Sequence, residues 1–247
     1  MEIINLGNTT TNNWLIGYEG KRILVDTGYP EAWPSFTRRL AKAGLTPGDI
    51  DWLFLTHAHD DHAGFVNELL AVSDCTAVAS ASALKGLRRG QNGPGGGAPD
   101  ADALAQCLWM VQQGHGAHRF PALAPGYEDR FLWVDDATRP DIEARLGLAI
   151  LPTPGHTGDS LSLLTPEGDL FCGDAAQNGR PTHGKTTIWI GDLATYIHSW
   201  EAILALDPQP RRIYPGHGRP FPTEELVASL PALREKSLHT MPRRKRK

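Results

Sequence analysis

The sequence contains few cysteines and no long hydrophobic run. Its three cysteines, Cys75, Cys107 and Cys172, are odd in number and far apart, with no CxxC pair. This usage argues against a disulfide scaffold and indicates a reducing compartment, so we expect a cytoplasmic protein. No run approaches the roughly 20 apolar residues of a membrane-spanning helix, and we therefore expect no membrane partner.

The sequence also lacks a strong excess of charge. Its formal net charge is -4 at pH 7, so no overall basic field indicates binding to nucleic acid or to an anionic membrane. The first five residues lack the basic and apolar regions of a signal peptide. Residues 241–247 form a basic tail, which we expect to be a solvated, disordered end rather than an anion-binding arm.

The length and composition fit one large domain with a sizeable core, because 40% of the 247 residues are hydrophobic. We expect a single domain over residues 1–240, with an insertion at about 80–136. Within that segment the glycine- and proline-rich stretch 91–99 predicts a loop, and 100–113 predicts a helix capped by Asp100 or Asp102. The sequence is compatible with an oligomer but does not indicate one.

Short apolar runs and helical periods alternate along the remaining chain. Strands are predicted at 14–18, 22–26, 50–55, 76–79, 146–151, 160–164, 169–172 and 212–214. Helices are predicted at 32–43, 64–72, 193–206 and 224–238, the last interrupted near Pro231.

The stretch from Thr56 to Gly64 directly follows one of these strands and places three histidines and two carboxylates within six residues. Three short motifs after later strands add further groups of the same kind: Gly155-His156, Gly173-Asp174 and Pro215-Gly216-His217. Loops at strand ends are where proteins commonly mount binding groups. We therefore expect the four loops to form one site.

The residue types in these loops are metal ligands. A single histidine is more often a surface or core residue, but three in one short loop would repel one another if buried and protonated without a metal. Five histidines and two aspartates exceed the needs of one tetrahedral ion and suit two divalent ions about 3.5–4 Å apart. The sequence therefore predicts two divalent metal ions, with Zn2+ preferred and Fe or Mn accepting the same ligands.

The series His57-x-His59-x-Asp61-His62 with the three later motifs, preceded by Leu24-Val25-Asp26-Thr27-Gly28, resembles the metallo-beta-lactamase-fold superfamily. The resemblance implies an α/β fold, a four-layer αββα sandwich with metals at one edge between the sheets. It implies that the first metal binds His57, His59 and His156. It implies that the second binds Asp61, His62 and His217, that Asp174 bridges, and that a metal-bridging hydroxide is the nucleophile. Asp26 and Thr56 would orient ligand histidines, or else form a strand-end turn and a cap, and Asp60 would be a spacer.

Within the superfamily the sequence looks most like the glyoxalase-II-like and lactonase-like branch. Flavin-dependent oxidases of the fold usually have glutamate where His59 stands. N-acyl-homoserine lactonases place a tyrosine shortly after the bridging aspartate, where this chain has Ala175-Ala176-Gln177-Asn178. We expect a hydrolase that cleaves an ester, thioester, lactone or amide of a small molecule. Alternatives are a phosphodiesterase or nuclease with the same site, and a non-catalytic metal-binding or sensory protein.

Four residues are candidates for catalytic roles. Asp174 and Asp61 would act through the metals. His183 could donate a proton to the leaving group and Lys185 could hold a substrate carboxylate or phosphate, although both could also be solvated loop residues. Side chains available to line the site from the insertion are Trp109, Met110, His115, His118 and Phe120. For Trp109 and Met110 we favour the simpler interpretation that they pack their helix on the sandwich.

Overall fold

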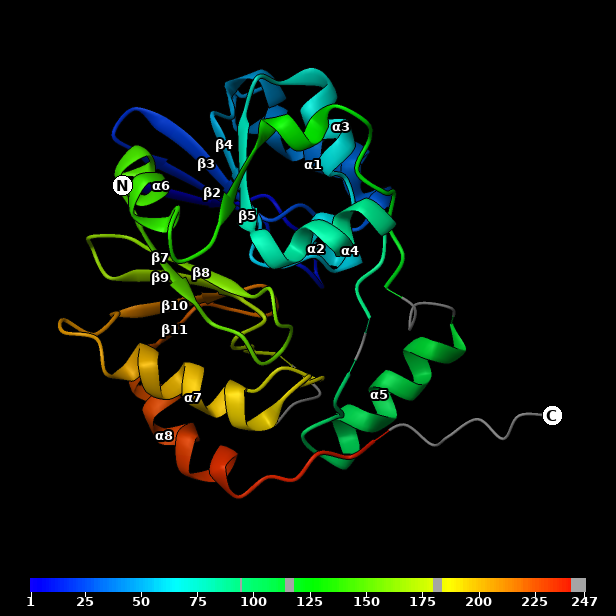
Figure 1. Ribbon diagram of the computed structural model, residues 1–247, viewed down its shortest axis with the longest axis vertical. Helices are drawn as coiled ribbons and strands as arrows, with labels where there is room; N and C mark the ends of the chain where they lie inside the picture. The colour runs from blue at the N-terminus through cyan, green and yellow to red at the C-terminus, as the bar shows by residue number, and fades with distance from the viewer. Residues whose placement is uncertain (94, 114–117, 180–183, 241–247) are drawn as a thin grey trace.

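The computed structural model has two β-sheets packed face to face, with helices on both outer faces (Figure 1). It describes residues 1–93, 95–113, 118–179 and 184–240. The four layers run helix, sheet, sheet, helix, which confirms the predicted αββα sandwich. The basic tail lies outside the described residues.

The first sheet has six strands in the order β1-β2-β3-β4-β5-β6. These are β1 (Glu2–Asn5), β2 (Trp14–Tyr18), β3 (Lys21–Val25), β4 (Trp52–Phe54), β5 (Thr76–Ser80) and β6 (Phe131–Val134). The first three pair antiparallel, and β3 to β6 pair parallel. Because β3, β4 and β5 run in one direction, the loop after β4 leaves the sheet at the edge where β3 also ends.

The second sheet has five strands in the order β11-β10-β9-β8-β7. These are β7 (Ala149–Pro152), β8 (Leu161–Leu164), β9 (Asp169–Gly173), β10 (Arg212–Pro215) and β11 (Phe221–Pro222). β10 is parallel to β9, and β8 is antiparallel to both β9 and β7. β7, β9 and β10 therefore point the same way, and their following loops emerge at one shared edge.

Helices cover the two outer faces. Over the first sheet lie α1 (Trp33–Lys42), α3 (Val66–Val72) and α4 (Leu84–Arg89), and over the second lie α7 (Leu193–Leu204) and α8 (Thr223–Arg234). The remaining helices are α2 (Asp60–Ala63), α5 (Ala101–Gln112) and α6 (Arg139–Leu146), with short 3-10 turns at Pro30–Ala32, Pro47–Asp49, Ala81–Ala83 and Tyr127–Arg130. α5 stands apart from both helical layers (Figure 1).

Alternation along the strands produces the layers. In β4, Leu53 packs with the α1 and α3 side chains, whereas Trp52 and Phe54 pack between the sheets. In β9, Phe171 packs between the sheets and Leu170 packs against α7 and α8. Successive strand residues point to opposite faces, so one apolar run fills two layers of core. This double burial explains why these strands read as continuous apolar sequence.

Several boundaries differ from those predicted. β6 pairs with β5, so the end of the expected insertion at 80–136 belongs to the first sheet. α8 continues through Pro231 instead of breaking there, because Leu226 and Leu233 on either side are fully buried and packing holds the helix. The helix expected at 64–72 is shorter and is preceded by α2, which carries part of the histidine-rich stretch. No helix in the described part of the chain combines the length and apolarity needed to cross a bilayer.

Candidate metal centre

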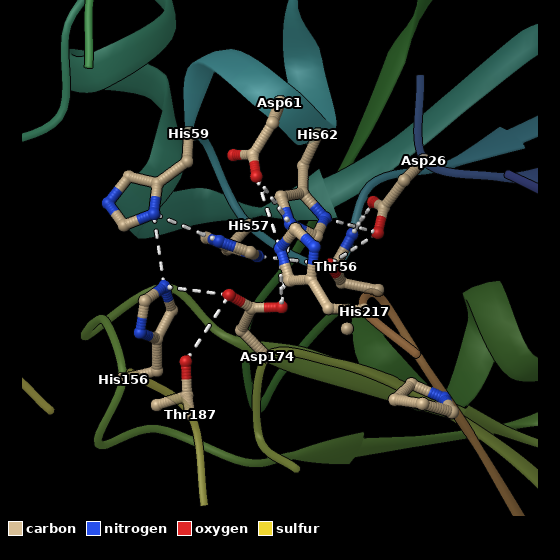
Figure 2. Close-up of polar contacts among 12 residues, drawn as sticks. Asp26, Thr56, His57, His59, Asp61, His62, His156, Asp174, Thr187 and His217 are labelled. Atoms are coloured by element: carbon tan, nitrogen blue, oxygen red, sulfur yellow. Dashed lines mark hydrogen bonds and ion pairs between the residues drawn. The ribbon is translucent and has the colours of Figure 1, made fainter. Parts of the chain in front are cut away.

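The predicted ligand residues converge at one edge of the sandwich, between the two sheets (Figure 2). The first sheet contributes the loop after β4 and the adjoining helix α2, and the second contributes the loops after β7, β9 and β10. The residues brought together are His57, His59, Asp61, His62, His156, Asp174 and His217. The shared strand direction in the second sheet is what gathers its three loops.

Three groups of these side chains have ligand atoms within 4.8 Å of one another. The groups are His57 with His59 and His156, His57 with His62 and Asp174, and Asp61 with His62 and His217. The first and the third, the two outer groups, are the ligand sets that the resemblance implies. The middle group shares one histidine with each of them, so the three groups form a continuous cluster able to hold metal.

Asp174 lies between the two outer groups. Its Oδ2 is 3.6 Å from His156 Nε2, and its Oδ1 is 3.4 Å from His217 Nε2. Thr187 Oγ1 donates to Oδ2 at 3.4 Å (Figure 2). The two carboxylate oxygens therefore face different groups of histidines.

Three buried atoms of the cluster have no hydrogen-bond partner among the described residues: His59 Nε2, His62 Nε2 and Asp174 Oδ1. A buried polar atom without a partner costs free energy, and proteins rarely leave one unless another group satisfies it. Imidazole nitrogens and carboxylate oxygens are the donors that Zn2+ and similar ions use. These residues therefore fit a metal site.

The two sides of the cluster differ in charge. Burial, together with the neighbouring histidines, lowers the pKa of His57 and of His59. Burial also opposes a charge on His62, but Asp61, Asp26 and Asp174 outweigh it and raise the pKa of His62 to about 9. The pKa of His217 is likewise raised despite burial, by Asp174 and Asp61. Without metal, one side is neutral imidazole and the other is made of carboxylate–imidazolium pairs.

Asp26 and Thr56 orient two of the histidines. Asp26 Oδ2 lies 2.8 Å from His62 Nδ1 and accepts a 2.7 Å hydrogen bond from Thr56 Oγ1. Thr56 Oγ1 is also 3.1 Å from His57 Nδ1. Asp26 holds this position with a left-handed backbone (φ 61°), which is unusual for a residue other than glycine and is typical of functional sites. Of the two interpretations of Asp26 and Thr56, the contacts match the orienting one.

Main-chain carbonyls hold two further histidines. His156 Nδ1 is 2.7 Å from Trp189 O, and His217 Nδ1 is 2.6 Å from Thr10 O. Such contacts fix the ring orientation and leave Nε2 directed at the cluster. Neither Trp189 nor Thr10 could have been found from the sequence, because a carbonyl partner has no side-chain signature.

Gly173 and Gly216 allow the loops of the second sheet to come close to those of the first. Gly173 has a left-handed φ of 50°, and a Cβ there would collide with Thr56 Oγ1. A Cβ on Gly216 would lie 2.5 Å from His62 Cε1 and 2.9 Å from Asp174 Oδ1. Any side chain at either position would push the loops of the second sheet away from those of the first.

A cavity of about 540 Å³ opens over the cluster. Its volume lies within the range of about 300–1,000 Å³ that small-molecule sites occupy. His59, Asp61, His156, Asp174 and His217 line one side. The other lining residues include Tyr29, Gln106, Cys107, Trp109, Met110, Val111, His118, Ile188 and Trp189. Burial and the charge of Asp61 raise the pKa of Tyr29, so its phenol stays a neutral O–H.

The expectation that Asp60 is a spacer is wrong. Its side chain is buried, and Asp60 Oδ1 lies 2.9 Å from His118 Nδ1. The ring of His118 stacks on that of His59, with 4.4 Å between the ring centroids and 17° between the planes. His118 also has a left-handed φ of 43°. Asp60 therefore fixes a cavity-lining histidine that follows α5 against a candidate ligand.

The structure places the other candidates differently from expectation. Lys185 Nζ pairs with Glu225 at 2.7 Å and donates to Asn178 Oδ1 at 2.6 Å, and Lys185 is not among the described residues that line the cavity. Its ammonium is engaged on the α8 side, and its role in holding substrate stays a prediction. His183 and His115 lie outside the described residues.

Trp109 and Met110 line the cavity, and Trp109 is 54% exposed, so the packing interpretation is wrong for them.

Comparisons with known proteins agree with this architecture. The sequence profile described as the metallo-beta-lactamase superfamily matches residues 6–217. A relative from Caenorhabditis elegans, named beta-lactamase-like protein 2 homolog, is 30% identical over 209 residues, which are 84% of this chain and 56% of the relative. An atrochrysone carboxyl ACP thioesterase from Passalora fulva is 28% identical over 214 residues, 84% of this chain and 48% of that protein. The chain spans about half the length of these relatives.

A solved structure shows the same fold. A mutant metallo-beta-lactamase from Cronobacter sakazakii superposes with a TM-score of 0.64 at 19% sequence identity, covering 94% of this chain and 90% of the other. At that identity the likeness extends to the sandwich and not to the substrate.

Proposed function

The chain belongs to the metallo-beta-lactamase superfamily, and on that premise we propose that it is a metal-dependent hydrolase of a small-molecule ester or thioester. Lactones and amides are chemically related substrates of the same site. The observation that carries the proposal is the position of Asp174, whose two oxygens face separate histidine groups beside a cavity of small-molecule size. The thioesterase name of the Passalora fulva relative supports a thioester.

The proposed centre holds two divalent ions, preferably Zn2+. His57, His59 and His156 would hold one, Asp61, His62 and His217 the other, with Asp174 between them. When bound, the ions would supply an activated nucleophile derived from water and polarise the carbonyl group under attack. Catalysis through such a centre needs ligands held rigidly, and the contacts of Asp26, Thr10 and Trp189 support that requirement.

Tyr29 is the proposed partner of the substrate carbonyl oxygen. It lines the same cavity as Asp61 and Asp174, and its phenol is neutral and able to donate. Tyr29→Phe should lower kcat while leaving metal content unchanged; a variant with full kcat would refute this role.

The cavity favours carbonyl over phosphodiester substrates. No Lys or Arg side chain occurs among the described residues that line it, and Glu31 and Asp61 add negative charge. Nucleic-acid sites usually neutralise phosphates with Lys and Arg. A nuclease or phosphodiesterase would therefore have to rely on the metals alone.

The direct test compares substrates on metal-loaded and chelator-treated protein. We expect about two ions per chain and turnover of p-nitrophenyl acetate and acetyl thioesters exceeding that of bis(p-nitrophenyl) phosphate. Preference for the phosphodiester would replace the proposal with a phosphodiesterase. Metal binding without turnover of either class would favour a non-catalytic metal-binding protein.

A further inference from the structure

We propose that α5 forms a binding wall for an apolar acyl group, so that the preferred substrates carry a medium or long aliphatic or aromatic acyl chain. The α5 wall is defined here as Cys107, Trp109, Met110 and Val111. This inference rests on the proposed hydrolase function and specifies which part of the substrate the chain selects.

α5 carries more apolar surface than its packing uses. Its sequence, ADALAQCLWMVQ, is mostly apolar, yet only Ala103 and Cys107 are buried. Trp109 is 54% and Val111 is 38% exposed. A helix that merely covers a core hides its apolar stripe and presents polar residues to water. An exposed apolar face beside a cavity is instead typical of a ligand site.

The α5 wall shares one cavity with the candidate metal ligands. All four of its residues line the cavity that also contains His59, Asp61, His156, Asp174 and His217. Ile188 and Trp189 line the same space from the loop before α7. A substrate whose carbonyl group reaches the metals can therefore extend its acyl chain along α5.

Specific contacts hold the α5 wall at a set distance from the metal centre. Cys107 Sγ donates to Ile188 O at 3.6 Å, and the next residue, Trp189, provides the carbonyl that holds His156. Trp189 Nε1 in turn donates to Gly95 O at 2.6 Å, before α5. Asp100 caps the helix through Ala103 N and pairs with Lys236 at 3.3 Å. The loop that orients a ligand thus also anchors the wall.

The chemistry of the lining identifies the occupant. The described lining residues include no Lys or Arg side chain for a carboxylate or phosphate, whereas Trp109, Met110, Val111, Ile188 and Trp189 offer apolar contact. Burial of apolar surface is then the main source of selectivity, and it increases with chain length. A second copy of this chain could cover the same face, and the experiment includes that outcome.

The test is a series of p-nitrophenyl esters from acetyl to decanoyl, measured with the metal-loaded full chain. Each added methylene that contacts the α5 wall should raise kcat/KM about fourfold, equivalent to about 0.8 kcal/mol per buried CH2. Val111→Ser and Met110→Ser should each reduce the decanoyl-to-acetyl ratio of kcat/KM. Val227→Ser is the matched control, because Val227 is 48% exposed on α8 and is not among the described lining residues. It should leave the ratio unchanged.

Calorimetry with octanoate and acetate gives a readout independent of turnover. Octanoate should bind more tightly than acetate, and Val111→Ser should reduce that difference. If no ester of the series is hydrolysed, the hydrolase proposal fails. If they are hydrolysed but chain length has no effect, or both wall variants keep the wild-type ratio, the acyl-wall proposal alone is overturned. A Val111→Ser variant that only converts a dimer to a monomer would reassign the wall to contact between copies.

Discussion

The two sides of the cavity are built in opposite ways. On the metal side, six of the seven candidate ligands are buried and His217 is half-buried. His62 is held by Asp26, and His156 and His217 are held by main-chain carbonyls. On the α5 side, a single helix presents partly exposed apolar residues and is anchored by its Asp100 cap and by the contact of Cys107 with Ile188 O. Rigidly held polar side chains suit bond cleavage, whereas the apolar residues of a separate helix can change without displacing those polar groups. If the proposed function is correct, reaction type and substrate choice are set by different parts of the molecule.

The largest expected effect is on the metal side. Asp174→Ala should reduce turnover of every ester tested by about 10³-fold or more, since metal centres contribute several kcal/mol of transition-state stabilisation. Steady-state kinetics with the acetyl and decanoyl esters would measure it. The decanoyl-to-acetyl ratio of any residual activity should stay as in the wild type. A surface control is Asp136→Ala, which should behave as wild type because Asp136 is exposed and lies outside the candidate site.

The second-largest expected effect concerns Asp26, which orients the candidate ligand His62 and is not among the described residues that line the cavity. Asp26→Asn should weaken metal affinity about 10- to 100-fold, because it disturbs the contact that orients His62. Chelator competition measures the affinity directly. Activity should return at high metal concentration, which separates loss of metal from loss of the fold. An unchanged affinity would mean that Asp26 serves only the strand-end turn.

The number of protons released when metal binds should also follow from the charge of His62 and His217. Without metal, His62 has a pKa of about 9 and the pKa of His217 is raised as well, so both hold protons at pH 7. Metal needs the neutral imidazole, so binding releases protons and apparent affinity rises with pH below the raised pKa values, by about tenfold per pH unit per proton. Calorimetry in two buffers of different ionisation enthalpy counts the protons. No release at pH 7 would contradict the assignment.

The sequence was sufficient to predict which residues gather on the metal side, because their local spacing and their positions at strand ends carry that signal. His57, His59 and Asp61 are neighbours in the chain, and His156, Asp174 and His217 each follow a strand whose apolar run is recognisable. The αββα layers were implied by the family resemblance that these motifs carry. The strands β1, β6 and β11 were not predicted.

The other side of the cavity depends on contacts between distant residues. Asp60 and His118 are 58 positions apart, and Lys185 meets Glu225 from another element. Nothing in the composition of 80–136 distinguishes a helix that lines a cavity from one that packs on the sandwich, so the sequence alone favours the packing interpretation of Trp109. Which face α5 presents is decided by its anchors at Asp100 and Ile188.

The smallest expected effect tests the contact that joins the two sides. Asp60→Asn keeps the size of the side chain but weakens the hydrogen bond that holds His118 against His59, a loss of about 0.5–1.5 kcal/mol. This corresponds to at most about a tenfold fall in kcat/KM. Metal content should be unchanged, and His118→Ala should give a similar fall. Because the two residues act through one contact, the double variant should be no worse than the poorer single variant. Additive losses in kcat/KM would show that Asp60 supports the metal side independently of His118. The hydrogen bond between Asp60 and His118 would then not connect the metal side of the cavity with the α5 side.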